Sequence, residues 1–207
     1  MTSTEAAPAP LEEFRAAVRE AVEAGENASV MQIDLDDFTT INVEAGREAG
    51  DRVLDAALAA GRAFAAESGW TWARTGGDEQ SVLAPGMSLE AAFLAAERLR
   101  VALDEAIAAV VPEGFSCRTS VGVSNVPRDA KGADDLLRKA DLALYSAKEQ
   151  GGGRVGLTPG DEMVLKSSYY GVAQLGRLRA LAERLKKKES VLLREALDDL
   201  LRKYDRS

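Results

Sequence analysis

Apolar residues recur every three or four positions in several segments of the chain, a spacing typical of helices that bury one face. This spacing predicts helices at 11–24, 48–67, 88–110, 133–149, 172–185 and 191–204. Short β-branched and apolar runs predict strands at 28–35, 70–74, 80–84, 115–126 and 154–157. Helices and strands alternate irregularly up to residue 157, so we expect an α+β sandwich in which helices flank a mixed β-sheet.

A Thr-Pro-Gly sequence at 158–160 predicts a domain boundary, because Pro and Gly interrupt regular structure. We expect an N-terminal tail with a short helix at 1–27, a main domain at 28–157 and a small strand-helix-helix module at 161–207. Residues 1–160 hold 15 Lys and Arg against 26 Asp and Glu, a net charge of −11. Residues 161–207 hold 11 against 8, a net charge of +3. The acidic main domain is therefore poorly suited to hold nucleic acid by charge, whereas the tail could do so.

Composition excludes several classes of function. The chain has no His and a single Cys, Cys117, which excludes a His base, His-ligated zinc and an internal disulfide. Any catalysis would have to use carboxylates, Lys or Arg, and a bound metal ion. No run of 18 apolar residues occurs, and the first residues lack the basic start and apolar core of a signal peptide. We expect no membrane association and a cytoplasmic location.

Acidic residues gather at two places in the predicted sheet. Asp34 and Asp36 point to one side of the end of strand 28–35, because alternate residues of a strand share a face. Asp78 and Glu79 follow a Gly-Gly pair at the tip of a predicted hairpin. If the two places adjoin, the carboxylates repel one another, and Mg²⁺ bound together with substrate phosphates would relieve this. The alternative interpretation is a pair of solvated acidic loops.

Five motifs follow one another between residues 28 and 157. They are Asp34-Leu-Asp36-x-Phe38, Ile41-Asn42 with Gly46 and Gly50-Asp51, Arg74-Thr-Gly-Gly-Asp-Glu79, Ser120-Val-Gly-Val123, and Ala140-Asp141-x-Ala-Leu-Tyr145-x-Ala-Lys148-x-x-Gly151. In this order and at this spacing they resemble the GGDEF domain of diguanylate cyclases. The resemblance implies a ferredoxin-like palm fold. It also implies a nucleotidyltransferase that condenses two GTP into cyclic di-GMP and releases pyrophosphate, acting as a homodimer in which each domain holds one GTP.

The same resemblance implies roles for individual residues. Asp34, Asp78 and Glu79 would be catalytic, and together with the Leu35 carbonyl they would hold Mg²⁺ (or Mn²⁺). The substrate would be bound by residues of four of the motifs: Phe38, Asn42, Asp51, Gly76, Gly77 and Lys148. Of these, Asn42 and Asp51 would recognise guanine, the two glycines would approach phosphates, and Lys148 would touch the γ-phosphate.

Several positions depart from the family pattern. Thr39 stands where the family has Lys, Val43 where it has Asp, Gln80 where it has Phe and Gly152 where it has Arg. Two of three expected phosphate-binding cations are thereby absent, unless Arg47 or Arg154 replaces them. The Arg-x-x-Asp inhibition site of many such cyclases is absent as well, since residues 67–70 read Glu-Ser-Gly-Trp. The alternative function is therefore a catalytically degenerate domain that binds a guanine nucleotide and regulates the tail. A different cyclic dinucleotide also stays open as product.

The tail resembles a ribbon-helix-helix module. The resemblance rests on Ser167-Ser-Tyr-Tyr170, a Leu repeat at 175, 178 and 181, and the segment Ser190–Leu197. It implies an intertwined dimer, because so short a segment cannot bury its own core. It also implies DNA binding through residues 163–194, although the strand offers one basic residue, Lys166. The alternative interpretation is an amphipathic helical hairpin that only dimerises.

Overall fold

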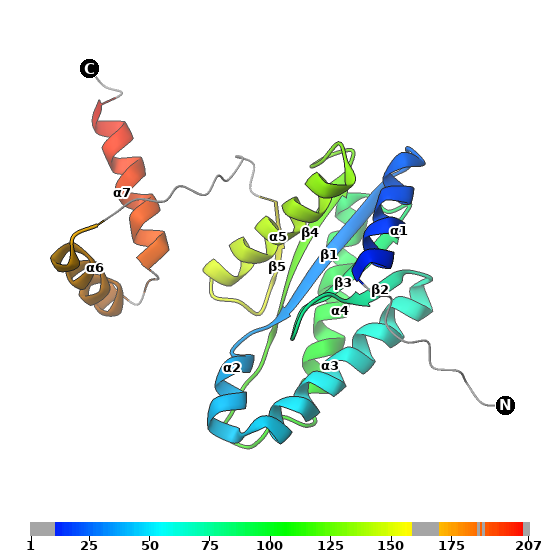
Figure 1. Cartoon of the computed structure of the whole chain (residues 1–207), viewed down its shortest axis with the longest axis horizontal. Helices are drawn as coiled ribbons and strands as arrows, with labels where there is room; N and C mark the ends of the chain where they lie inside the picture. Colours follow the sequence, from blue (N-terminus) through cyan, green and yellow to red (C-terminus); the bar gives the residue numbers. More distant parts are fainter. Residues whose placement is uncertain (1–10, 159–169, 186, 188, 205–207) are drawn as a thin grey trace. The chain divides into compact units, whose positions relative to one another are not determined.

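A five-stranded sheet organises the first of two units in this computed structural model, which describes residues 11–158, 170–185, 187 and 189–204 of the 207. The strands lie in the order β2-β3-β1-β4-β5 (Figure 1). Their bounds are β1 Ala28–Leu35, β2 Thr71–Arg74, β3 Gln80–Pro85, β4 Thr119–Val126 and β5 Val155–Leu157. Neighbouring strands run antiparallel, except that β4 and β5 are parallel.

Helices cover both faces of this sheet (Figure 1). One face packs against α3 (Arg47–Ser68) and α4 (Leu89–Ala108), and the other against α1 (Leu11–Glu23) and α5 (Ala133–Glu149). A short helix α2 (Phe38–Thr40) and a π-helical turn η1 (Ile41–Ala45) connect β1 to α3. The predicted class, an α+β sandwich with a mixed sheet flanked by helices, is confirmed.

The central strand β1 is apolar on both faces because helices cover both. Ile33 and Leu35 belong to the core beneath α3 and α4, and Val30 belongs to the core beneath α1 and α5. Two polar residues, Gln32 and Asp34, interrupt this apolar run near its end. The end of β1 is therefore the part of the strand that is equipped for chemistry.

The structure differs from the sequence-based prediction at the strand β4 and at the turns α2 and η1. The strand predicted at 115–126 begins only at Thr119, because β1 supplies partners no further than the Asp36 N–H, and Asp37 then turns away with a φ of +59°. The turns α2 and η1 were not predicted from periodicity, because each is too short to repeat an apolar face. The strand expected in the tail falls on residues outside those described, apart from Tyr170.

The second unit, Met163–Ser207, contains α6 (Val172–Leu185) and α7 (Glu189–Tyr204), which pack on each other. Among its described side chains, only Ala182 and Leu192 are buried. Large apolar side chains stay exposed instead: Tyr170, Val172, Leu175, Leu185, Leu193, Leu197, Leu200 and Tyr204. The unit by itself therefore leaves most of its apolar surface uncovered.

Candidate active site

The end of β1 places a buried carboxylate next to a cation from α5. Asp34 is 9% exposed and lies opposite Ser120 of β4 in the antiparallel ladder. Its Oδ1 forms an ion pair with Nζ of Lys148, which lies in the last turn of α5. Two of the residues expected in the site are therefore in direct contact, although they are 114 positions apart in sequence.

The hairpin acids act on the same carboxylate. Burial raises the pKa of Asp34 above its ordinary value, and the negative charges of Asp78 and Glu79 raise it further, while Lys148 opposes both effects. Three of the acids expected in the site thus lie within electrostatic range of one another. Together they carry more negative charge than one ammonium group neutralises.

The tip of the β2–β3 hairpin is held in shape by its own backbone. The N–H groups of Thr75 and Gly76 donate to the Glu79 carbonyl at 3.0 and 3.3 Å. The Arg74 guanidinium donates to the carbonyls of Gly76 and Gly77, with a shortest distance of 2.7 Å. The Arg74 side chain is therefore committed to the turn itself.

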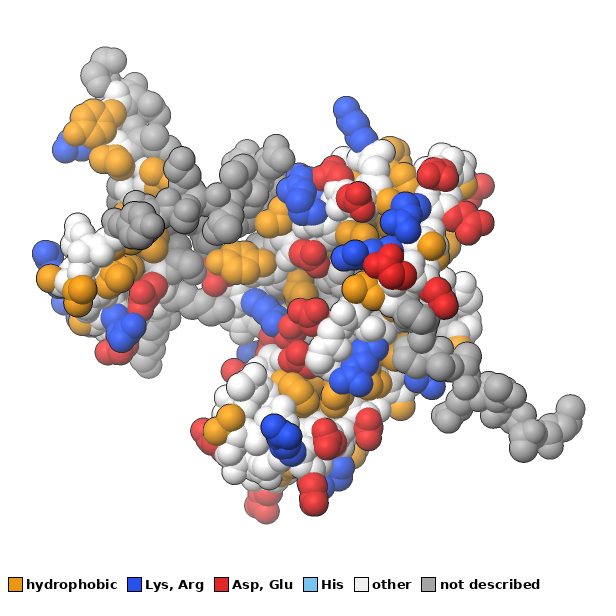
Figure 2. Space-filling view, in the orientation of Figure 1, with side chains coloured by type: hydrophobic (Ala, Val, Ile, Leu, Met, Phe, Trp, Pro, Cys, Tyr) orange, Lys and Arg blue, Asp and Glu red, His pale blue; other side chains and the backbone are white. Residues whose placement is uncertain are grey.

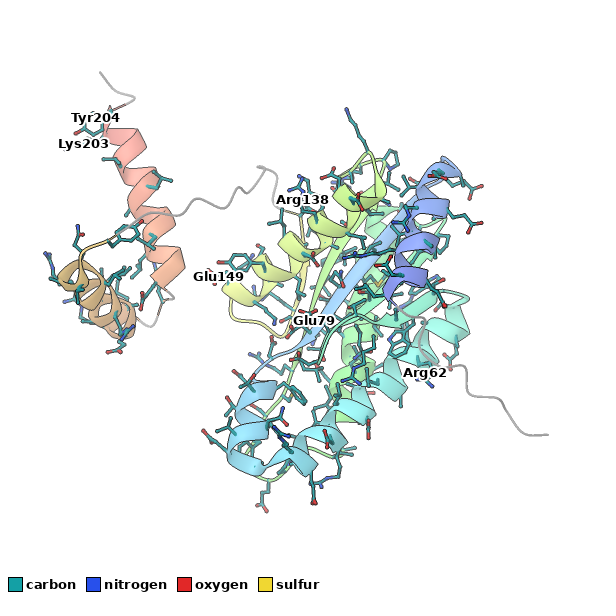
Figure 3. The ribbon with its side chains drawn as sticks, in the orientation of Figure 1. Arg62, Glu79, Arg138, Glu149, Lys203 and Tyr204 are labelled. Atoms are coloured by element: carbon teal, nitrogen blue, oxygen red, sulfur yellow. The ribbon has the colours of Figure 1, made fainter. Side chains whose placement is uncertain are left out.

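The two glycines of the tip have different surroundings. A Cβ at Gly76 would stand 2.5 Å from Oε2 of Glu79, so the Glu79 carboxylate lies directly against the Gly76 backbone. A Cβ at Gly77 would meet nothing within 4 Å, which leaves the space beside this backbone open. Figure 3 labels Glu79 on this hairpin.

The second expected part of the site lies between η1 and α3. A Cβ at Gly50 would stand 2.1 Å from Oδ1 of Asn42, so the Asn42 amide lies on the backbone of Gly50. Asn42 is fixed there by a hydrogen bond from its Nδ2 to the Phe38 carbonyl at 3.3 Å. Asp51 follows on the next position of α3 and is exposed. The expected guanine pair, Asn42 and Asp51, is thus adjacent in space.

The side chains of two further expected residues pack in or against the hydrophobic core. Phe38 is partly buried against the core beneath α3 and α4, and Leu35 is 2% exposed within that core. Leu35 could therefore contact a ligand only through its backbone.

Asp36 has a different role from the one its motif suggests. Both of its carboxylate oxygens accept from the Ser120 hydroxyl, at 2.8 and 2.9 Å, and Oδ2 also accepts from the Gly153 N–H at 2.7 Å. A Cβ at Gly152 would stand 2.6 Å from the same oxygen. Asp36 therefore ties the end of β1 to β4 and to the loop that follows α5, a connection that sequence spacing could not predict.

Gln80, at the position of the signature Phe, is fully buried beneath the hairpin. Its Oε1 accepts from Trp72 Nε1 at 2.9 Å, and its Nε2 has no partner among the described residues. The pair packs against α3 at Gly61, where a Cβ would stand 2.4 Å from the Gln80 oxygen. A hydrogen-bonded pair of Gln80 and Trp72 therefore lies beneath this hairpin, with Gln80 at the position of the family's Phe.

A recess of about 170 Å³ lies on the other side of the hairpin, lined in part by Arg15, Gln32, Glu79 and Asp141. Asp141 is exposed as a whole residue, yet burial of its carboxylate raises its pKa, and the charge of Glu79 raises it further. Asp141 belongs to the fifth motif, and the resemblance implied no role for it. The sequence did offer one signal of a role in the site: Asp141 lies seven residues before Lys148, a spacing that places both on one face of a helix.

The donor set at the end of β1 fits a hard divalent cation. Among the residues that the structure describes, no group of three or more His, Cys, Asp or Glu is arranged to hold a metal ion. Mg²⁺ does not require such a group, because it often takes one or two carboxylates and completes its shell with water and substrate phosphates. Asp34, with the charges of Asp78 and Glu79 nearby, supplies carboxylates of this kind.

Comparison with known proteins identifies both units. Residues 9–154 match the family described as "Diguanylate cyclase, GGDEF domain", and residues 169–205 match the ribbon-helix-helix domain. The chain belongs to the GGDEF diguanylate cyclase family and carries a ribbon-helix-helix domain after it.

Curated relatives are similar over the first unit. Diguanylate cyclase A of Treponema denticola is 34% identical over 136 residues, covering 66% of this chain and 36% of that protein. The cyclic di-GMP phosphodiesterase NbdA of Pseudomonas aeruginosa is 35% identical over 127 residues, covering 61% of this chain and 16% of that protein. The chain thus spans little more than a third, or less, of the length of these relatives.

Solved structures confirm the palm fold. The active GGEEF domain of a diguanylate cyclase from Vibrio cholerae superimposes with a TM-score of 0.65 at 25% identity, covering 72% of this chain and 97% of that domain. The GGDEF domain of YfiN from Pseudomonas aeruginosa gives a TM-score of 0.63 at 29% identity, covering 75% and 99%. Within the described ranges, no helix has the length and apolar character needed to cross a membrane.

Proposed function

We propose that this protein is a diguanylate cyclase that condenses two GTP molecules into cyclic di-GMP, depends on Mg²⁺ or Mn²⁺ and acts as a homodimer. The proposal rests on the cluster at the end of β1. There the buried Asp34 contacts Lys148, and the negative charges of Asp78 and Glu79 raise the pKa of Asp34. An acidic centre beside open glycine backbone suits a polyphosphate that arrives with its own cation.

The proposed reaction forms two phosphodiester bonds. The 3′-hydroxyl of each GTP attacks the α-phosphorus of the other. Each attack forms one phosphodiester bond, breaks the bond to pyrophosphate and releases one pyrophosphate and one proton, and the second attack closes the ring. Asp34, Asp78, Glu79 and the Leu35 carbonyl would hold the divalent cation. A divalent cation at this place supplies charge neutralisation and lowers the pKa of the attacking hydroxyl. Lys148 would exchange its contact with Asp34 for a contact with the terminal phosphate.

Guanine recognition is proposed for Asn42 and Asp51. The Asn42 amide is already fixed by the Phe38 carbonyl and by its contact with Gly50. The exposed Asp51 carboxylate can accept from the N1 and N2 donors of guanine, and adenine does not offer this pair of donors. We therefore expect GTP to be preferred over ATP.

Homodimerisation is proposed to occur through the tail. Most of the described apolar side chains of α6 and α7 are exposed, among them Val172 at 89% and Leu197 at 54%. A unit this small rarely forms a sufficient core alone, and a second copy of the same unit would cover these side chains. The tail would then hold two GGDEF domains at high local concentration.

The deciding experiment is incubation of the purified full chain with GTP, with ATP and with both, in the presence of Mg²⁺ or Mn²⁺, followed by mass spectrometry of the products. Cyclic di-GMP together with pyrophosphate from GTP alone supports the proposal. A mixed or adenine product would correct the substrate, and the absence of any cyclic dinucleotide would contradict the catalytic assignment.

A second candidate is a catalytically degenerate GGDEF domain that binds a guanine nucleotide and regulates DNA binding by the tail. Two departures from the family pattern favour it: the buried Gln80, whose Nε2 has no partner among the described residues, and glycine at position 152 in place of the family's Arg. The discriminating measurement is a gel shift with a double-stranded DNA library at several salt concentrations, with and without GTP. A salt-dependent shift that GTP alters, without turnover, would support this candidate.

A further inference from the structure

The three glycines that follow α5 offer an anion neither a side chain nor a backbone donor. Glycine occupies positions 151–153, with φ values of +107°, +67° and +61°. The first two N–H groups donate back to carbonyls in the last turn of α5 at 3.1 Å. The third, that of Gly153, donates to Asp36 at 2.7 Å. Any cation beside these glycines must therefore come from a neighbouring residue.

Arg118 supplies a guanidinium at this loop. Its carbonyl accepts from the Asp36 N–H at 2.8 Å, which places it opposite the end of β1, one position before β4. A Cβ at Gly153 would stand 2.8 Å from Nη1 of Arg118, and Nη2 donates to the Gly151 carbonyl at 3.1 Å. This is the side chain's single hydrogen bond to described residues, and the residue is exposed. Its other N–H donors thus remain available to a ligand.

Two other cations near the cluster are engaged, because Lys148 contacts Asp34 and Arg74 holds the hairpin carbonyls. Arg154 donates to Gln150 at 3.3 Å, at the end of α5, whereas Arg118 adjoins Gly153, whose N–H binds Asp36. Arg118 lies on the Asp36 side of the strand end and Lys148 on the Asp34 side. Asp34 lies in β1 and Asp36 directly after it, about 7 Å apart along an extended chain. The two cations therefore lie near successive carboxylates at the end of β1, where both can contact one chain of phosphates.

We propose that Arg118 is a phosphate-binding residue of the nucleotide site, contacting the triphosphate of GTP alongside Lys148. The proposal rests on the proposed nucleotide function and adds a residue to it. A planar guanidinium with donors to spare suits a phosphate, because it can give two parallel hydrogen bonds to its oxygens. Its hydrogen bond to the Gly151 carbonyl orients it without using those donors.

The test is a binding series on the full chain with the variants Arg118→Ala and Arg118→Gln. Dissociation constants are measured calorimetrically for GMP, GDP and a GTP analogue with a methylene bridge between its α- and β-phosphates, so that turnover plays no part. We expect Arg118→Ala to weaken binding of the analogue about tenfold, the factor set by one hydrogen bond to a charged group. The loss should shrink from the triphosphate to GMP, and it should shrink as salt is added.

The matched control is Arg128→Gln, which removes one positive charge just after the opposite end of β4 and should change affinity less than about twofold. An equal loss in Arg128→Gln would reveal a general effect of charge and overturn the assignment. So would an equal loss for GMP and the triphosphate analogue, or unchanged affinity in Arg118→Gln. If wild type binds the analogue and Arg118→Gln binds it equally well, the role of Arg118 is refuted while the proposed function stands. If wild type binds no guanine nucleotide, both the inference and the proposed function fail. Should Arg118→Ala not fold, Arg118→Gln decides, because its amide can still donate to Gly151.

Discussion

Asp34 lies in β1 and Asp36 directly after it, yet their surroundings give the two carboxylates different roles. Asp34 is buried, and the acids of the hairpin raise its pKa. Asp36 has both oxygens engaged by Ser120 and Gly153. Two carboxylates of one motif thus separate into one suited to a metal ion and one that fixes the loop after α5.

We expect Asp34→Asn to abolish cyclic dinucleotide formation while leaving the folded protein as stable as wild type, or more stable. The amide removes a negative charge from beside Asp78 and Glu79, so repulsion in the metal-free protein falls. The loss of activity should exceed the 10–100-fold effect that is usual for residues behind a metal ligand. Product assays test the expected loss of activity, and urea unfolding at pH 7 tests the expected stability. A variant that is both unstable and inactive would indicate a structural acid instead.

The single thiol gives a pH-dependent prediction. Burial raises the pKa of Cys117 from 9.0 to about 12, helped by the charge of Asp36. Between these values the unfolded state loses this proton and the folded state keeps it, so the thiol's contribution to stability falls as pH rises above 9. We expect wild type to lose about 1 kcal/mol more stability between pH 8 and pH 10 than Cys117→Ala does. Urea unfolding of both proteins at the two pH values measures this, and the cost of any cavity cancels in the comparison.

The residues of the candidate site were predictable from motifs, but their contacts were not. The ion pair between Asp34 and Lys148 joins motifs that are far apart in sequence. The role of Arg118 depends on the backbone of Gly153 coming close to its guanidinium, which no local pattern encodes. Motifs identify the residues of the site, and the order of the strands in the sheet determines which of these residues come into contact.

Among the elements, α5 matters most for the site, because it carries Lys148 and packs closely on β4. A Cβ at Gly122 of β4 would stand 2.1 Å from the backbone nitrogen of Leu144 and 2.3 Å from the carbonyl oxygen of Ala140. These are backbone atoms of α5 and cannot move aside as a side chain can. Gly122 therefore sets how close α5 comes to the sheet.

Gly122→Ala should lower stability by about 3 kcal/mol, at the upper end of the usual cost of overpacking. It should also lower cyclase activity, because α5 can accommodate the methyl group only by moving Lys148 away from the strand end. The matched control is Gly132→Ala before α5, where φ is −148° and a Cβ meets nothing within 4 Å. Thermal unfolding should place the control within about 1 kcal/mol of wild type. Equal stability of the two variants would contradict the close-packing argument.

Long periodic elements were predictable to within a residue or two, and α5 matches its predicted bounds. The errors fell where tertiary pairing sets the limits. β4 begins at Thr119 because β1 offers no partner further along, and the turns α2 and η1 are too short for a periodic signal. Pattern alone could not supply the sheet order β2-β3-β1-β4-β5, which brings the hairpin beside the end of β1.

At the scale of the whole molecule, two units with different charge share one chain. The first unit carries the candidate active site, and Figure 2 shows acidic and basic side chains interspersed over the visible face of that unit, without one basic patch. In the second unit, most of the described apolar side chains of α6 and α7 are exposed. In the proposed homodimer, a second copy of the chain would cover these side chains.

Removal of residues 159–207 should convert the dimer into a monomer and make cyclase activity strongly dependent on protein concentration. In the proposed reaction, two GTP-loaded domains must meet for each product, and the tail would keep them at a high effective concentration that dilution of the intact dimer would not change. Sedimentation and initial rates over a hundredfold range of concentration measure both effects.

A charge placed in the exposed apolar surface, Leu197→Glu, should reproduce the effects of the truncation within the full chain. Replacing the tail with an unrelated dimeric coiled coil should restore concentration-independent activity if the tail serves only to bring two domains together. A truncated chain that remains dimeric and fully active would place the dimer interface in the GGDEF unit instead.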